Sequence, residues 1–271
     1  MIHVLTVHWK NAEWIEPQLG YLARHIGRPY RVYAFLNGID PAPYRDKFFH
    51  VCTEDIKSHA VKLNLLADMA CMAAEGPDDW LVFLDSDAFP IADVVTYAES
   101  RLEKYPLIAV RRDENLGDPQ PHPCFCITTV GFWKDIGGDW KRGYGWKNAT
   151  GKLVTDVGGN LLGKLRERNI EWLPMLRSNT HNLHPVFFGI YDNLVYHHGA
   201  GSRKPVIRVD KAGFSKQPWL LRKLLTALRV YKFWKGRALK KNAELSERIM
   251  REIKSDPEFH LQFSQASRGQ P

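Results

Sequence analysis

The sequence predicts an α/β protein in which helices flank a mostly parallel β-sheet. Short apolar runs rich in β-branched and aromatic residues alternate along the chain with longer segments of helical spacing. This alternation is typical of strand–helix–strand units, which build parallel sheets covered by helices. The 271 residues, 44% hydrophobic and 25% charged, are enough for one substantial core in an ordinary globular composition.

The first half of the chain carries this alternation most clearly. Strands are expected at residues 3–8, 30–36, 48–52, 81–84 and 107–111, and helices at 13–25, 58–74 and 91–104. Pro17 is compatible with the first helix because it falls in the first turn. Asn37-Gly38 is a turn pair that ends the second strand.

The second half of the chain is less regular. In order, we expect a polar loop with several prolines at 112–123, a strand at 125–132, a Gly- and aromatic-rich segment at 137–148, a short helix at 155–168 and a strand at 186–196. Beyond residue 214 the pattern is helical to the end. The chain therefore divides into an α/β domain, residues 1–210, and a basic helical extension, residues 211–271.

The charge of the chain is concentrated in this extension. The net charge is +8, yet ten Lys and Arg residues and no acid lie between Lys211 and Ala243. An enzyme of nucleic acids more often spreads basic residues around its cleft, so we expect no nucleic-acid partner.

The cysteines and the start of the chain indicate the cytoplasm. Cys52, Cys71, Cys124 and Cys126 show no C-x-x-C spacing, so neither a zinc site nor a disulfide framework is expected. The first residues lack the pattern of a signal peptide. No apolar run approaches the ~18 residues of a membrane-spanning helix.

The strongest chemical motif is Asp85-Ser86-Asp87, directly after the apolar run 81–84. Residues one apart in extended chain point to the same side. At the carboxyl end of a strand they face the crevice where open α/β sheets bind ligands. Two unpaired carboxylates there would repel, and a divalent cation removes the conflict. Ordinary loop acids are the alternative.

A second motif follows the late strand. His198-x-x-Gly201-x-x-Lys204-Pro205 places an imidazole, a glycine and basic groups in one segment. Imidazole suits Mn²⁺ better than Mg²⁺, so Mn²⁺ is the expected cation, with Mg²⁺ as the alternative. Gly201 allows close approach of backbone to phosphate, and Arg203 or Lys204 can neutralise a leaving diphosphate. His197 competes with His198 for the metal, and a plain surface loop is the other interpretation.

Together these motifs resemble the nucleotide-sugar-dependent glycosyltransferases of the GT-A fold, especially bacterial lipopolysaccharide-type and glycogenin-like enzymes. The resemblance covers roughly residues 1–210, the expected catalytic domain, and departs from the family where Val206 replaces a Trp after Lys-Pro. It implies transfer of a sugar from a nucleotide sugar, a UDP-sugar, to a glycan or lipid-linked glycan. The implied metal ligands are Asp85, Asp87 and His198.

The resemblance also assigns residues to the donor and the acceptor. The implied donor-binding residues are Thr6, Val7, His8, Asn37, Lys62, Asn64, Ser86, Gly201, Arg203 and Lys204. Asp156 is the acceptor-side carboxylate: a general base if the reaction inverts, an acceptor-positioning group if it retains. Its alternative is a plain helix N-cap. Trp140, Tyr144 and Trp146 either stack on an acceptor sugar or belong to the core.

Two other functions compete. A haloacid-dehalogenase-type phosphatase also has D-x-D after an apolar strand, but Phe89 stands where that class has Thr or Val. A non-enzymatic binder of membrane surfaces would use the basic tail alone.

The tail predicts membrane attachment for the enzyme too. Between residues 219 and 234, Leu and aromatic residues recur at helical spacing opposite basic ones. We therefore expect residues 216–241 to bind the anionic inner face of the cell membrane. The alternative is a helix that packs its apolar face on the catalytic domain.

Overall fold

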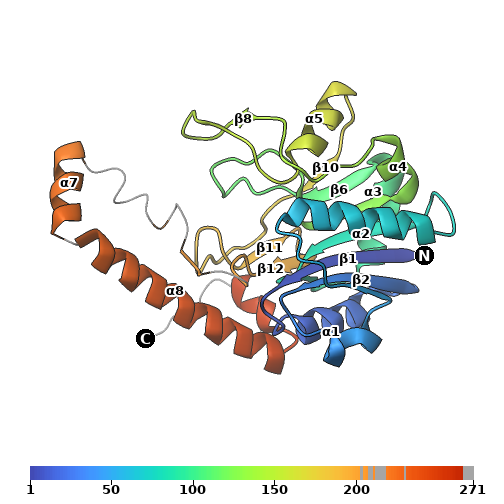
Figure 1. The fold of residues 1–271 in the computed structure, drawn as a ribbon, viewed down its shortest axis with the longest axis horizontal. Helices are drawn as coiled ribbons and strands as arrows, with labels where there is room; N and C mark the ends of the chain where they lie inside the picture. Colours follow the sequence, from blue (N-terminus) through green and yellow to red (C-terminus); the bar gives the residue numbers. More distant parts are fainter. Residues whose placement is uncertain (202–203, 207–209, 211–217, 229, 265–271) are drawn as a thin grey trace.

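The computed structural model describes residues 1–264 apart from 202–203, 207–209, 211–217 and 229 (Figure 1). Its centre is a seven-stranded sheet in the order β10-β6-β7-β4-β1-β2-β3. The strands are β1 (Ile2–Trp9), β2 (Tyr30–Asn37), β3 (His50–Cys52), β4 (Trp80–Asp85), β6 (Leu107–Val110), β7 (His122–Thr129) and β10 (Leu173–Met175). All neighbouring pairs are parallel except the two that involve β7. The predicted mostly parallel sheet is confirmed.

Helices cover both faces of this sheet. The helices of the α/β region are α1 (Ile15–His25), α2 (His59–Ala73), α3 (Val94–Lys104), α4 (Val130–Asp135) and α5 (Gly159–Glu167), with a 3₁₀ turn at Ala42–Lys47. One apolar core packs α1 and α3 against one face, and a second packs α2, α4 and α5 against the other. Strand β4 serves both cores, because Val82 and Leu84 face the first while Leu81 and Phe83 face the second.

A small antiparallel sheet extends the strand that carries the acidic motif. It consists of β11 (Gly189–Tyr191), β12 (Val195–His197) and β5 (Ala88–Pro90), in that order. Strand β5 begins directly after Asp87, and its Ala88 pairs with His197. The end of β12 is therefore held beside the acidic turn. A two-stranded ribbon, β8 (Trp146–Lys147) with β9 (Leu153–Val154), lies apart from both sheets.

The structure revises several boundaries in the second half. The expected strand 186–196 is split into β11 and β12 by a tight turn, where Asp192 and Asn193 have φ of 48° and 53°. The helix expected from residue 155 begins at Gly159, because Gly158 is its N-cap with φ of 89°. That left-handed conformation suits glycine. The strand expected to residue 132 ends at Thr129, whose side chain caps α4.

The C-terminal part is helical, as predicted. It contains α7 (Trp219–Ala227), α8 (Val230–Ser255) and a 3₁₀ turn at Phe259–Phe263. Figure 1 shows α7 and the start of α8 extending away from the body, while the end of α8 packs against it. Ile249, Ile253 and Phe259 share a third core with Trp14 and Phe89. Among the described residues, no helix combines the length and apolarity needed to cross a bilayer.

Candidate functional site

The turn after β4 is held from beneath by one buried glutamine. Gln18 of α1 donates from Nε2 to the carbonyl oxygens of Asp85 and Ala88, at 2.8 Å each. Its Oε1 accepts from the Thr6 hydroxyl at 2.9 Å. Buried amides keep their position when all their polar atoms are satisfied. The backbone that presents the two acids is therefore fixed by contacts inside the protein.

Asp85 lies among imidazoles. Its Oδ1 is 3.0 Å from Nε2 of His59, and its Oδ2 is 3.7 Å from Nε2 of His197. Burial alone would raise the pKa of this carboxyl, but the hydrogen bond and charge of His59, with the charges of His122 and His197, lower the pKa below its ordinary value. Asp85 is therefore present as the carboxylate, the form that binds cations.

Asp87 is held instead by the backbone. Its Oδ2 accepts from the amides of Gly199 and Gly201 at 3.0 and 2.7 Å, and its Oδ1 lies 3.6 Å from Nε2 of His197. Burial and the charge of Asp85 raise the pKa of the Asp87 carboxyl. The two acids are thus in electrostatic conflict, as the sequence predicted for a D-x-D without a cation.

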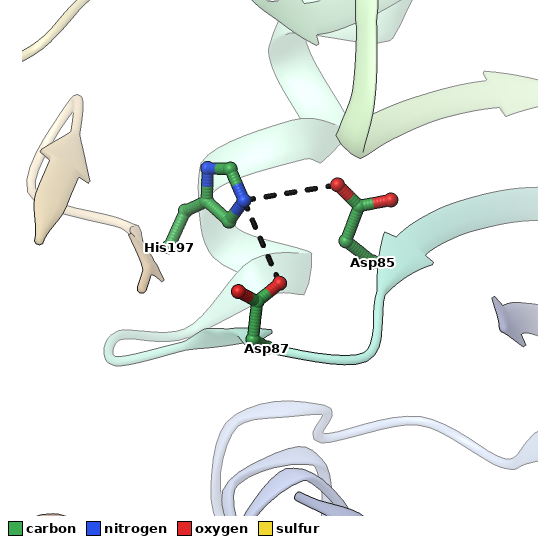
Figure 2. A group of neighbouring side chains, drawn as sticks. All are labelled: Asp85, Asp87 and His197. Carbon is green, nitrogen blue, oxygen red and sulfur yellow. Dashed lines mark ion pairs between the residues drawn. The ribbon is translucent and has the colours of Figure 1, made fainter. Parts of the chain in front are cut away.

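Three ligand atoms converge here. Figure 2 shows the His197 ring directed between the two carboxylates. One ligand atom from each of Asp85, Asp87 and His197 lies within 4.8 Å of the others. Two carboxylate oxygens and one imidazole nitrogen fit a divalent cation such as Mn²⁺, with open positions for a substrate. The residues present therefore fit the predicted metal.

The structure places His197, and not the predicted ligand His198, in the group of ligand atoms with the two carboxylates. The His198 ring points away from the carboxylates into the protein, where it is fully buried. Its Nδ1 lies 2.9 Å from the Tyr196 hydroxyl and its Nε2 lies 2.6 Å from the Ser246 hydroxyl. Successive residues at the end of β12 face opposite sides, so only one of the two histidines reaches the acids. That histidine is His197.

A cleft of about 820 Å³ opens at this site. It runs along the carboxyl end of β4, from Trp9 and Lys62 on one side to Arg142 and Asp156 on the other. Val7, Ser86 and Gly201, all predicted donor residues, line it as well. Its volume is in the range of small-molecule binding sites.

Two predicted donor residues meet at one end of the cleft. Lys62 is buried, and its Nζ donates to Oδ1 of Asn37 at 2.8 Å. Burial lowers the pKa of this lysine, and the charge of Asp55 opposes that shift. The exposed Trp9 ring lies beside it, 5.8 Å from Nζ to the ring centre. The ammonium group of Lys62 and the ring of Trp9 therefore lie side by side in the lining of the cleft.

The other predicted donor residues lie elsewhere. Thr6 and His8 are fully buried beneath the cleft, and the pKa of His8 is lowered by burial to about 4. Asn64 faces the opposite side of α2 from Lys62, where it bonds to Asp139. Lys204 is exposed and is not among the lining residues. Arg203 lies outside the described residues.

The predicted acceptor-side residues also lie in different environments. Asp156 lines the cleft, with its carboxylate half-exposed and 3.4 Å from Arg142, and it does not cap α5. Trp146 lines the cleft with 5% of its surface exposed. Trp140 is fully buried in the second core, since it packs on Phe83. Tyr144 lies outside the cleft, with its hydroxyl bonded to Arg166.

Several cleft residues escaped the sequence analysis. They are Trp9, His59, Arg112, Asp118 and His122. Asp118 is 7% exposed, accepts from Asn115 at 2.6 Å, and has its pKa raised by burial. Nδ1 of His122 accepts from the Cys124 amide at 3.1 Å, and burial and Arg112 lower its pKa to about 3.

Two searches against known sequences returned nothing. No protein-family model matches the chain, and no curated protein matches it.

Solved structures that resemble this one include glycosyltransferases. TarS residues 1–349 from S. aureus in complex with UDP has 16% identity and a TM-score of 0.38, over 52% of this chain and 50% of that one. The mannosyltransferase PcManGT from Pyrobaculum calidifontis, in complex with GDP-Man and Mn²⁺, has 16% identity and 0.39, over 52% and 47%. The catalytic domain of Drosophila β1,4-galactosyltransferase 7, in complex with xylobiose, has 12% identity and 0.40, over 73% and 70%. The chain spans about half the length of the first two.

Proposed function

We propose that this protein is a metal-dependent glycosyltransferase that moves a sugar from a nucleotide-diphosphate donor to a glycan or lipid-linked glycan, with a UDP-sugar as the expected donor. The observation that carries the proposal is the convergence of Asp85, Asp87 and His197 at the wall of a cleft of about 820 Å³. Carboxylates and one imidazole at the carboxyl end of a parallel strand suit a cation that binds a diphosphate.

The metal and donor roles follow from the positions of the lining groups. Mn²⁺ is the proposed cation, with Mg²⁺ as the alternative. When bound, it supplies Lewis-acid stabilisation of the leaving diphosphate. In this proposal the Trp9 ring stacks on the nucleobase, Lys62 and Asn37 bind the adjoining polar groups, and Ser86 binds the diphosphate, which lies against the Gly201 backbone.

The acceptor side is assigned to the far end of the cleft. Trp146 offers an apolar ring to a sugar face, and Asp156 offers a carboxylate to the acceptor hydroxyl. In an inverting reaction Asp156 takes the hydroxyl proton, and in a retaining one it positions the acceptor. Asp118 is a second candidate for this role, because it is a more deeply buried carboxylate in the same cleft as Asp156.

Thermal melting with Mn²⁺ and nucleotide diphosphates tests this function. We expect UDP and Mn²⁺ together to raise the Tm, since ligand at 100 times its Kd adds about 2.7 kcal/mol to the free energy of unfolding. Asp87→Asn should abolish the combined shift. If no nucleotide diphosphate shifts the Tm in the presence of Mn²⁺, the proposal is wrong. Hydrolysis of UDP-sugars then identifies the sugar.

We also propose that α7 and the start of α8 attach the enzyme to an anionic membrane. Large apolar side chains are exposed there: Trp219 by 58%, Leu220 by 71%, Leu224 by 56%, Leu228 by 64% and Phe233 by 74%. Lys223, Lys232 and Lys235 lie on the same segment. Each basic residue near an anionic surface contributes roughly 1 kcal/mol, and aromatic residues favour the interface. The exposure supports attachment over packing on the catalytic domain.

Sedimentation with vesicles tests the attachment in the full chain. Removing the tail is unsuitable, because Ile249, Ile253 and Phe259 belong to a core. The double variant Leu220→Ser/Leu224→Ser should lose binding to anionic vesicles, and high salt should release the wild type. Met72→Ser, at an 80% exposed site on α2, is the matched control and should bind normally. Equal binding to neutral vesicles would contradict the proposal.

A further inference from the structure

Helix α8 changes character along its length. Its first half, from Val230 to Lys241, is largely exposed, whereas the second half begins with Asn242, only 6% exposed, and continues to the fully buried Ile249. The second half carries two polar side chains with partners outside the helix, Asn242 and Ser246. They contact the segment that follows β12.

Ser246 fixes the ring of His198. Its Oγ lies 2.6 Å from Nε2, and the Tyr196 hydroxyl lies 2.9 Å from Nδ1, so both ring nitrogens have partners. The ring centre is 4.7 Å from that of Trp14 and 4.8 Å from that of Phe188. The imidazole is therefore enclosed on its faces and bonded at both nitrogens.

The backbone at and after this ring holds Asp87. The amide of His198 donates to the Asp87 carbonyl at 2.9 Å, and the amides of Gly199 and Gly201 donate to Oδ2. The Gly201 carbonyl in turn accepts from Asn11 at 2.8 Å and from Trp14 at 3.2 Å. A Cβ on Gly201 would lie 2.5 Å from Cβ of Asp87. The segment and the carboxylate are in direct contact, so neither can shift alone.

Asn242 fixes the far end of the same segment. Its Nδ2 donates to the Pro205 carbonyl at 2.8 Å and to Oδ1 of Asp210 at 3.2 Å. Oδ1 of Asp210 also lies 3.0 Å from Nε2 of His184. One helix therefore contacts the segment at His198, before the glycines, and at Pro205, after them.

We propose that Ser246 and Asn242 are positioning residues for the metal site, which act through the backbone amides of Gly199 and Gly201. By fixing these amides on Oδ2 of Asp87, α8 leaves Oδ1 directed toward His197 and the cation. The inference rests on the metal site of the proposed function. Partners that orient a ligating carboxylate typically change metal affinity 10–100-fold when removed.

Mn²⁺ binding to the full chain, measured by the EPR signal of free Mn²⁺, tests the proposal without any substrate. We expect Ser246→Ala to weaken Mn²⁺ binding on the order of 10-fold, at the low end of that range because the effect passes through His198. Ser246→Thr retains the hydroxyl and should restore the affinity. Ser255→Ala, which removes a hydroxyl bonded only within α8, is the matched control and should bind as the wild type.

Asn242→Ala provides an independent variant, should Ser246→Ala melt too low for titration. It should weaken Mn²⁺ binding in the same direction. Wild-type affinity in both variants, each shown folded by circular dichroism, would overturn the inference. Asp87→Asn separates this failure from that of the proposed function. If Asp87→Asn loses Mn²⁺ binding while the α8 variants keep it, only the role of α8 is wrong; if Asp87→Asn also binds normally, the metal site itself is wrong.

Discussion

The two sides of the cleft are built in different ways. The sheet-borne side consists of Asp85 at the end of β4, Asp87 in the turn after it, and Lys62 on α2, the helix packed on the sheet. Its polar groups are held by buried partners. The opposite side comes from the loop 111–121 and from the ribbon of β8 and β9, where Asp156 is half-exposed and its neighbour Arg142 is more exposed still. Rigid elements position a site more precisely than loops do. In the proposed glycosyltransferase, this difference predicts fixed binding of the metal and the donor, with adaptable binding of the acceptor.

The largest expected effect lies on the sheet-borne side. Asp87→Asn removes a charge from the cation site while keeping the shape of the side chain. We expect transfer activity to fall by at least about 10²-fold, since a metal that stabilises a leaving group is worth several kcal/mol. Mn²⁺ affinity should fall with it. Asp68→Asn, at an exposed acid of α2, is the control for loss of one charge and should behave as the wild type.

Asp156→Asn tests the loop-borne side. We expect turnover to fall about 10²-fold, because a positioned acid or base typically contributes 10²- to 10⁴-fold. Mn²⁺ and UDP binding should stay unchanged, which would separate the two sides of the cleft. Asp118→Asn, measured in parallel, should cost less. A larger loss in Asp118→Asn would move the acceptor carboxylate to the loop 111–121.

The variant Gly201→Ala tests how rigid the sheet-borne side of the cleft is. The added methyl would approach Asp87 and Nε1 of Trp14 to 2.5 Å each, so the carboxylate must shift. We expect Mn²⁺ affinity to fall on the order of 10-fold. Gly20→Ala, where an added Cβ meets no atom within 4 Å, should have no effect on affinity. Unchanged affinity in Gly201→Ala would mean that this wall adapts as readily as the other.

The smallest expected effect concerns Trp146. Trp146→Phe reduces the ring that faces the cleft and should raise the KM for the acceptor several-fold while leaving the KM for the donor unchanged, because stacking on one ring is worth about 1 kcal/mol. Trp140→Phe alters a fully buried ring of the second core. It should lower the Tm without changing either KM. An effect of Trp146→Phe on donor KM would show that the two sides share a substrate group.

The sequence was most informative where local pattern decides structure. The apolar run before Asp85 predicted both the strand and the position of the acids. Lys62, in contrast, was implied only by the resemblance to GT-A enzymes, and the structure places it against Asn37 at the end of β2. The alternation of side chains along a strand allows only one of His197 and His198 to face the acids. Which one does so depends on the pairing of His197 with Ala88, a contact between segments more than 100 residues apart. No local pattern contains that register.

Burial of aromatic residues was equally hard to predict. Trp140, Tyr144 and Trp146 lie within seven residues of one another, yet Trp140 is in the core, Tyr144 accepts a hydrogen bond from Arg166 of α5, and Trp146 lines the cleft. Asp118 was missed because nothing in the sequence indicates that β7 runs antiparallel to β4. That reversal returns the preceding loop to the same edge of the sheet as Asp85.

The reversed strand has a consequence for how such an enzyme diversifies. The loop 111–121 lines the cleft before β7 begins, whereas Asp85 is the last residue of β4 and Asp87 lies in the turn after it, so the loop and the acids belong to separate stretches of sequence. Insertions, deletions or grafted segments in that loop can change which molecules fit while the ladder between β4 and β7 keeps its register. In the proposed glycosyltransferase, a library randomised over 113–120 is therefore the economical starting point for changing the acceptor.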